Sequence, residues 1–374
     1  MALIIDLTRM SAAYGTRLLA EMGHRVIRVE QPEGDELRRA GPFLQDRIDL
    51  EHGAFHQYLN SGKESLALDI ASDHGGDVLR ALATAADALI MTRPCGFEPE
   101  WFFALNPRMA VIAVDDVANE LCAYARSGLL SLTGHPGLPP ALLGGHAPLS
   151  AIGLYVAVAA AAALLARQAS DQGQHVEVSS RQCLESLAEQ ALLTFHTTGQ
   201  APERRGFRGA ITAVSGAFQC ADGYWMVSIP HDPQGWARLM DWIDDPELRA
   251  DASLADEGQR LQKRDFILDR ISEWSLTRKK NDLVTEAQAR HIPASPVATM
   301  LDLARDPQLL ARGFLQPRRH PELGEILFPV GPCGRAAGAP MRRAPRLGED
   351  TAQILAELGL ASAARPAVPE TGTT

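Results

Sequence analysis

The sequence predicts an α/β fold built on a parallel sheet, together with a smaller α+β region supplied by the middle of the chain. In the first 115 residues, short apolar strand-like runs alternate with amphipathic helix-like runs. From about residue 210, a hairpin signal and tryptophan-containing helical stretches replace that alternation. The length of 374 residues is sufficient for two domains of ordinary size.

The first strand is the apolar run 3–7 (LIIDL), and an amphipathic helix over 12–22 follows it and ends at Gly23. The run 25–30 (RVIRVE) predicts a second strand. A helix between two strands makes a βαβ unit, in which the strands are parallel and the crossover is right-handed.

The same alternation continues along the chain. It predicts strands over 64–70, 88–91, 109–114 and 175–178, and helices over 76–86 and 181–195. A strand ending in an acid, here Glu30, is typical of dinucleotide-binding folds. However, the turn over 8–12 (TRMSA) lacks the glycines that let backbone approach a pyrophosphate, so we expect no nicotinamide or flavin site.

The run 147–166 contains no charged residue and is as long as a membrane-spanning helix. Nine of its residues are alanine, which is small and only weakly apolar and suits close packing inside a protein. We therefore expect a buried central helix and no membrane partner.

The polar, basic stretch 197–208 (TTGQAPERRGFR) indicates a loop or a domain boundary. Asp222-Gly223 is a strong turn signal inside a hairpin over 217–229. Helical stretches with three tryptophans follow, then short strands, a helix over 351–358 and a flexible tail over 364–374.

Composition excludes several classes of function. The formal net charge is −10 and no basic patch stands out, so we expect no nucleic-acid partner. Five cysteines lie far apart without a CxxC pair, which indicates free thiols in a reducing compartment and no metal site. The N-terminus lacks the pattern of a signal peptide, and we expect a cytoplasmic protein.

Many short motifs occur in the order typical of one family. They are 5–8 (IDLT), 18–30 (LLAEMGHRVIRVE), 34–42 (GDELRRAGP), 59–69 (LNSGKESLALD), 93–94 (RP), 104–108 (ALNPR), 127–129 (SGL), 133–134 (TG), 164–167 (LLAR), 173–179 (GQHVEVS), 292–297 (IPASPV), 306–308 (DPQ), 311–313 (ARG) and 347–349 (LGE). Across nearly its whole length the chain resembles the class III CoA-transferases, the formyl-CoA and carnitine CoA-transferase type, and the related α-methylacyl-CoA racemases.

The resemblance implies a Rossmann-like large domain made from both ends of the chain, 1–196 and 301–363, and a smaller domain over 210–300. It also implies an interlocked dimer, either of two identical chains or with a homologous subunit. The substrates would be an acyl-CoA and a carboxylic acid, with the CoA nucleotide on the large domain. In the family, one aspartate attacks the thioester to form a mixed anhydride.

That aspartate is expected just before the central helix, four residues ahead of a glycine. Counting back from Gly153 gives Leu149, and a shift by one gives Ser150. No acid occurs between Glu120 and Asp171. The racemase histidine is missing too, because its helix position holds Asn119. The usual nucleophile is therefore absent at its expected place.

Lys63 and Arg93 match family positions near the nucleotide end of CoA, where cations pair well with phosphates, and Arg38 and Arg39 could add to them. The resemblance thus implies a CoA site formed by Arg38, Asn60, Lys63 and Arg93, although an isolated lysine or arginine is usually a solvated surface residue.

Three residues close to the position of the missing aspartate are candidate replacement catalysts. His146 could be a general base, Ser150 an activated nucleophile, and Glu120 a carboxylate from the preceding helix. Each also has a purely structural interpretation: His146 as a loop residue, Ser150 as a helix N-cap and Glu120 as a first-turn acid.

Three functions stay open at this point. The chain could act on CoA thioesters, either as a transferase by another route or as an isomerase, lyase or dehydratase. It could be a catalytically silent CoA-binding subunit that pairs with an active homologue. It could also have lost CoA and bind another acidic small molecule.

Overall fold

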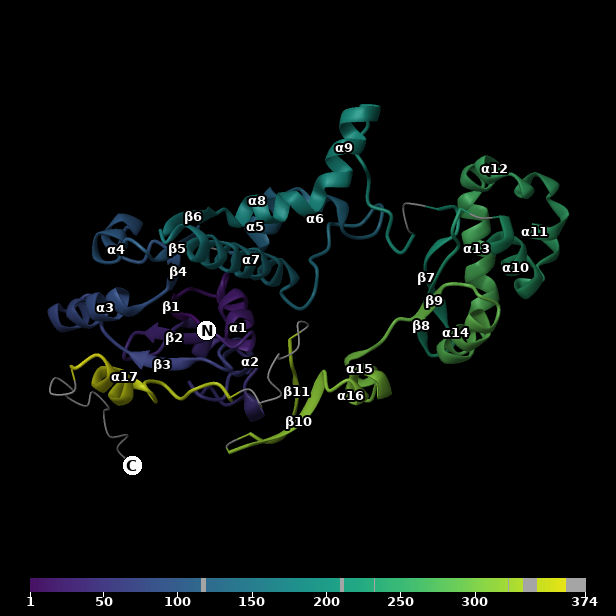
Figure 1. The fold of residues 1–374 in the computed structure, drawn as a ribbon. Coiled ribbons are helices and arrows are strands. Elements are labelled where there is room, and N and C mark those ends of the chain that lie inside the picture. The colour runs from purple at the N-terminus through teal and green to yellow at the C-terminus, as the bar shows by residue number, and fades with distance from the viewer. Residues whose placement is uncertain (116–118, 209–211, 232, 322, 332–341, 361–374) are drawn as a thin grey trace. The chain divides into compact units, whose positions relative to one another are not determined.

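The computed structural model describes residues 1–115, 119–208, 212–231, 233–321, 323–331 and 342–360. The chain forms two compact units (Figure 1). The larger unit comprises residues 1–130, 142–201 and 309–374, and the smaller unit comprises 131–141 and 202–308. The segment 131–141 thus packs with the smaller unit, although in sequence it lies far from the rest of that unit.

A six-stranded parallel sheet forms the centre of the larger unit, with the order β3-β2-β1-β4-β5-β6. The predicted α/β fold with a parallel sheet is confirmed. The strands are β1 (Leu3–Leu7), β2 (Arg25–Glu30), β3 (Glu64–Ala67), β4 (Ala88–Arg93), β5 (Ala110–Asp115) and β6 (Gln174–Val178).

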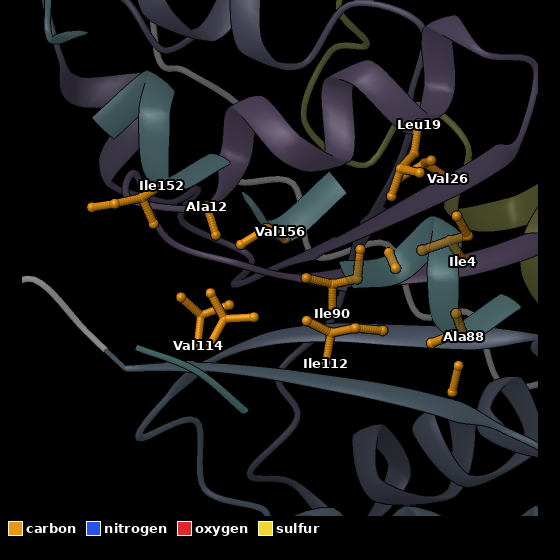
Figure 2. Close-up of a cluster of buried hydrophobic side chains, with 14 of the residues drawn as sticks. Ile4, Ala12, Leu19, Val26, Ala88, Ile90, Ile112, Val114, Ile152 and Val156 are labelled. Atoms are coloured by element: carbon orange, nitrogen blue, oxygen red, sulfur yellow. The ribbon is translucent and has the colours of Figure 1, made fainter. Parts of the chain in front are cut away.

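Both faces of this sheet are buried, because successive side chains along each strand point to opposite sides. Ile4, Ile90 and Ile112 join one cluster, which contains Ile152 and Val156 from the central helix (Figure 2). Their neighbours in the strands join a second cluster with helices from the other face. The continuous apolar runs in the sequence are explained by this double burial.

The helices that belong wholly or partly to the larger unit are α1 (Ala13–Glu21), α2 (Ala54–Leu59), α3 (Asp73–Ala85), α4 (Pro99–Leu105), α5 (Glu120–Arg126), α6 (Leu129–Leu132), α7 (Ala147–Ser170), α8 (Ser180–Glu185), α9 (Glu189–Thr198) and α17 (Thr351–Glu357). Side chains of α1, α7 and α8 pack on one face of the sheet, and side chains of α3, α4 and α17 pack on the other. The helix predicted over 181–195 is divided into α8 and α9 by a short 3₁₀ turn at Ser186–Ala188.

The predicted central helix is α7, and one of its faces packs against the sheet and α1. By length and composition α7 could also cross a membrane, with 44% of its most apolar stretch buried. Leu154, Val158 and Leu165 lie on its other side and are 52–69% exposed. The helix is therefore buried on one side only, which the uniform composition of the run did not reveal.

The segment after residue 309 returns to the larger unit. There β10 (Leu315–His320) and β11 (Gly324–Pro329) form an antiparallel pair. At the start of α17, Asp350 Oδ2 accepts a hydrogen bond from Ser65 N at 2.9 Å, and Thr351 Oγ1 accepts one from Ala67 N at 3.0 Å. These contacts satisfy the free edge of β3, which otherwise exposes unpaired N–H groups.

The smaller unit contains an antiparallel sheet of three strands, β7 (Ser215–Cys220), β8 (Gly223–Ser228) and β9 (Ala294–Pro296). The predicted hairpin with its turn at Asp222-Gly223 is confirmed by the pairing of β7 with β8. Helices then enclose a core around the fully buried Trp225.

These helices are α10 (Pro233–Ile243), α11 (Pro246–Ala250), α12 (Glu257–Gln262), α13 (Arg264–Ser275), α14 (Lys280–Ala289) and α15 (Met300–Ala304), and α16 (Pro307–Ala311) leads out of the unit. The tail predicted to be flexible, 364–374, lies outside the described residues.

Candidate functional site

The order of the strands places a topological switch point between β1 and β4. In open parallel sheets, ligands bind outside the carboxyl ends of the strands at such a point. A cavity of about 280 Å³ lies there. It is lined by residues that follow or end β1, β2 and β4 and the segment after β3, namely Leu7, Thr8, Arg9, Arg28, Val29, Glu30, Gln31, Asp35, Leu68, Ile70, Thr92, Pro94 and Cys95.

Side-chain hydrogen bonds shape the loop after β1, which lacks the glycines of a dinucleotide site. Asp6 Oδ1 accepts hydrogen bonds from Thr8 N at 2.9 Å and from Thr8 Oγ1 at 2.6 Å. Arg9 N donates to Thr92 Oγ1 at 3.0 Å. The loop is thus held against both strands that flank the switch point. Glu30, at the end of β2, is already engaged by Arg38 and by Ser65 Oγ at 2.8 Å.

Lys63 lies inside the protein. Its side chain is fully buried, and Nζ donates to Asp6 Oδ2 at 2.9 Å and to Asn60 Oδ1 at 3.0 Å. Burial lowers the pKa of Lys63 to about 8, against the opposing effect of Asp6. Burial also raises the pKa of Asp6, but the charges of Lys63 and Arg28 outweigh it and hold that pKa well below its usual range.

Arg38 and Asn60 are fully buried as well. Arg38 binds Glu30 through Nε at 2.7 Å and Nη2 at 2.9 Å, and its Nη1 donates to Glu51 at 2.8 Å. The Nδ2 of Asn60 lies 3.0 Å from His56 Nδ1. A CoA phosphate would reach these groups, or Lys63, only if the buried pairs opened. Their part in binding stays a prediction, and the contacts present are structural.

Arg93 differs from these three because it ends β4 at the carboxyl edge of the sheet and is 35% exposed. Its Nη2 lies 3.2 Å from Glu177 Oε1, and that carboxylate is 62% exposed. Solvent-exposed pairs of this kind are weak and exchange partners readily. Of the four predicted cofactor-binding residues, Arg93 is therefore the one available to a ligand as the chain stands.

Two of the three candidate catalysts are brought together. His146 Nδ1 and Glu120 Oε2 are 2.6 Å apart, although 26 residues separate them in sequence. Phe55 of α2 packs edge-on against the His146 ring, with centroids 4.7 Å apart. Glu120 Oε1 is buried and has no hydrogen-bond partner among the described residues. The arrangement leaves one oriented carboxylate oxygen unused.

Ser150 does not join this pair through any contact within the described part of the chain. Ser150 is not the N-cap of α7, as its structural interpretation expected. The N-cap is His146, whose backbone is left-handed with φ of 53°. The His146 carbonyl oxygen accepts a hydrogen bond from Ser150 N at 3.1 Å. Leu149 is 8% exposed and belongs to the apolar cluster under the sheet. The position expected for the nucleophile is therefore occupied by a core residue.

Asn119 acts as the N-cap of α5, since its Oδ1 accepts hydrogen bonds from Leu121 N and Cys122 N. Sequence reasoning missed Thr92 and Cys95, which line the switch-point cavity. Their place directly at and after the end of a buried strand was the available signal. Among the described residues, no group of three metal-ligating side chains occurs.

Comparisons with known proteins show the family to which this chain belongs. The model for CoA-transferase family III matches residues 2–351. The chain is 28% identical to succinyl-CoA:mesaconate CoA-transferase of Haloarcula hispanica, covering 96% of this chain and 95% of that protein. It is 29% identical to subunit BbsE of succinyl-CoA:(R)-benzylsuccinate CoA-transferase of Thauera aromatica, covering 95% and 93%.

A solved structure of a CAIB/BAIF family protein from Brucella suis superimposes with a TM-score of 0.82 at 25% identity, covering 96% of this chain and 98% of the other. The resemblance inferred from the sequence motifs is confirmed across the chain. This chain belongs to CoA-transferase family III.

Proposed function

We propose that this protein moves CoA from an acyl-CoA to a free carboxylic acid, with Glu120 as the nucleophile. The observation that carries the proposal is the Glu120 carboxylate, oriented by His146 beside the start of α7, with Oε1 buried and without a hydrogen-bond partner among the described residues. A family member needs one nucleophilic carboxylate, and Glu120 supplies it from α5. The relatives named above, both called CoA-transferases, support the reaction class.

The chemistry balances without a net proton. Glu120 Oε1 attacks the thioester carbonyl, the C–S bond breaks, and CoA leaves as a thiolate. The thiolate then attacks the Glu120 carbonyl of the resulting anhydride and expels the donor carboxylate. The acceptor carboxylate attacks the glutamyl thioester, and the released thiolate attacks the acceptor carbonyl of the new anhydride, which regenerates Glu120. The hydrogen bond between His146 and Oε2 fixes the carboxylate and leaves Oε1 to react.

The CoA nucleotide would occupy the switch-point cavity. Arg93 and the exposed Arg9 lie at the ends of β4 and β1, where cations can meet the phosphates of CoA. β5 leads to α5, so Glu120 and the cavity lie at the same carboxyl edge of the sheet. We also expect the reaction to take place in the cytoplasm.

The experiment uses succinyl-CoA as donor and a panel of acids drawn from the names of the relatives: mesaconate, glutarate, oxalate and benzylsuccinate. Transfer is followed by chromatography of the acyl-CoA products. Hydroxylamine added during turnover should convert the activated side chain to a hydroxamate, which peptide mass spectrometry locates. We expect the modification at Glu120 and loss of transfer by at least about 10³-fold in Glu120→Gln.

The chain offers a matched control. His231 Nδ1 pairs with Glu257 Oε1 in the smaller unit, an exposed histidine–glutamate pair of the same kind. Glu257→Gln should retain full activity. Transfer at the normal rate in Glu120→Gln would disprove the assignment of the nucleophile.

A second function is favoured by one observation. The Thauera aromatica relative is named as a subunit, and Leu149, where the sequence motif leads us to expect the nucleophile, is an apolar residue and is buried. The chain would then be a silent CoA-binding partner of an active homologue, within the interlocked dimer that the family resemblance implies. Exposed apolar side chains of α7 and α9, among them Leu154, Val158, Leu192 and Leu193, offer a surface for such a partner.

The two functions are separated by the chain expressed alone. Native mass spectrometry gives its oligomeric state, and the transfer assay gives its activity. An active homodimer supports the first function. An inactive chain that still binds CoA, and that gains activity only with a homologous subunit, supports the second.

A further inference from the structure

The smaller unit contains a cavity of about 640 Å³ that no part of the proposed reaction uses. Its walls come from the segments 135–136 and 204–208, from β7 and β8, and from α12 and α13. All of these belong to the same compact unit. The lining includes four arginines and two aspartates, which gives a net charge of about +2 in a chain whose overall charge is −10.

The two aspartates are already used. Arg208 donates through Nη1 to Asp265 and through Nη2 to Asp269 at 2.6 Å. Arg204 is also engaged, because Nη2 donates to Leu138 O at 3.0 Å and so fastens 131–141 to 202–208. These bonds build the wall of the cavity.

Arg264, the first residue of α13, differs from these two arginines. Its Nε and Nη2 are buried and have no hydrogen-bond partner among the described residues. Burial lowers the pKa of Arg264, and the charges of Arg205 and Arg208 add to that effect more than Asp265 opposes it. A buried guanidinium without an acceptor is costly, and a bound anion would supply the missing acceptor.

The lining of the cavity also includes apolar side chains. Phe207 and Tyr224 lie with ring centroids 5.6 Å apart and an interplanar angle of 31°, and Phe218 and Leu268 also line the space. Ligand sites are typically apolar pockets with a few placed polar groups that fix orientation. Here the lining combines four arginines with aromatic rings.

We propose that this cavity binds a small organic dianion, whose carboxylates or phosphate contact Arg264 and Arg205 while a ring or alkyl portion lies against Phe207 and Tyr224. The net charge of the lining matches two negative charges on the ligand. The cavity volume of about 640 Å³ lies within the ordinary range of small-molecule pockets and accommodates a molecule of the size of an aryl dicarboxylate or an aryl phosphate. The site does not depend on the proposed nucleophile, because every contact lies in the smaller unit.

Isothermal titration calorimetry on the full chain tests this, with phenylsuccinate, phenyl phosphate and inorganic phosphate as probes. The first two distinguish a carboxylate from a phosphate ligand, and the third measures what the charge alone contributes. We expect saturable binding of at least one aryl dianion, weaker binding of inorganic phosphate, and an affinity that falls as salt rises. No saturable heat with any probe at 10 mM would overturn the proposal.

Variants locate the site. Arg264→Met should weaken binding at least about 10-fold, while Arg249→Met, an exposed arginine of α11 paired with Asp244 outside the cavity, should leave it unchanged. Because Arg264→Met removes two buried nitrogens that have no hydrogen-bond partner among the described residues, the variant should melt no lower than the original chain in the absence of ligand. Unchanged affinity in Arg264→Met would refute the assignment. Glu120→Gln should still bind the probe, which separates this proposal from the proposed reaction.

Discussion

Asp6 lies at the centre of a buried charge network in the larger unit. Its replacement by asparagine tests how much this network contributes to the stability of that unit. Asp6 Oδ2 lies 2.9 Å from Lys63 Nζ, 3.3 Å from Arg28 Nη1 and 2.8 Å from Thr16 Oγ1. All these side chains are between 0% and 2% exposed. Asp6→Asn keeps the shape of the side chain and removes its charge, so two buried cations lose a counter-ion.

Breaking one partner out of a buried ion pair typically costs about 3–5 kcal/mol. The lower end applies here, because Arg28 keeps its contact with Asp35 and Lys63 can lose its proton. The pKa of Lys63 is already lowered to about 8, so neutralising it near pH 7 is inexpensive. We therefore expect Asp6→Asn to reduce the free energy of unfolding of the larger unit by about 3 kcal/mol.

Hydrogen exchange with mass spectrometry measures this locally, in peptides that cover β1 and β3, so unfolding of the smaller unit does not confuse the result. The matched control is Asp77→Asn, because Asp77 pairs with Arg80 at 3.0 Å on the surface, where the carboxylate is 71% exposed. That change should cost less than about 1 kcal/mol. Equal losses in the two variants would refute the reasoning.

A double variant separates charge from packing. Lys63→Met combined with Asp6→Asn removes one stranded cation together with its partner, so it should recover part of the stability lost in Asp6→Asn. A double variant that is less stable than both single variants would show that the contacts of the lysine chain, and not its charge, stabilise this region.

Two further predictions concern pH and packing. Burial, aided by the charge of Arg38, lowers the pKa of His56 from 6.5 to about 3. Between pH 7 and pH 5 the His56 side chain therefore binds a proton in the unfolded chain but not in the folded chain. The free energy of unfolding should fall by about 2 kcal/mol over this range. His56→Gln should flatten that slope in urea titrations, and an unchanged slope would contradict the assignment to His56. Gly153→Ala would place a Cβ 2.8 Å from Tyr14 Cβ and 2.9 Å from Gly15 N, so α1 and α7 must separate at a cost of about 1–3 kcal/mol. Thermal unfolding measures it, and a melting temperature equal to that of the original chain would contradict the close approach.

The strands of the sheet could be predicted from the sequence, because a parallel strand is covered on both faces and its apolar run is therefore continuous and short. β1, β2, β4 and β5 all lie within a residue or two of the predicted ranges. The division of the predicted 181–195 helix into two helices could not be predicted, since nothing in its composition indicates the 3₁₀ turn at Ser186–Ala188.

The charged residues were harder to interpret. A lysine such as Lys63 has the same identity in a ligand site as in a buried ion pair, and only the position of Asp6, 57 residues away, decides between them. The same holds for Arg38 and Glu30. Family resemblance identified these positions as important, and burial showed that their contacts are internal.

By itself, the sequence determined the succession of the parallel-sheet strands along the chain, the resemblance of the chain to its family and the absence of an acid near Leu149, because these depend on local patterns along the chain. Tertiary structure alone decided that Glu120 meets His146, that Leu149 is buried, and that Nε and Nη2 of Arg264 have no acceptor among the described residues. Those properties depend on which distant segments share a few ångströms of space, and on whether water reaches them. Neither the proximity of distant segments nor the access of water can be derived from the spacing of residues along the chain.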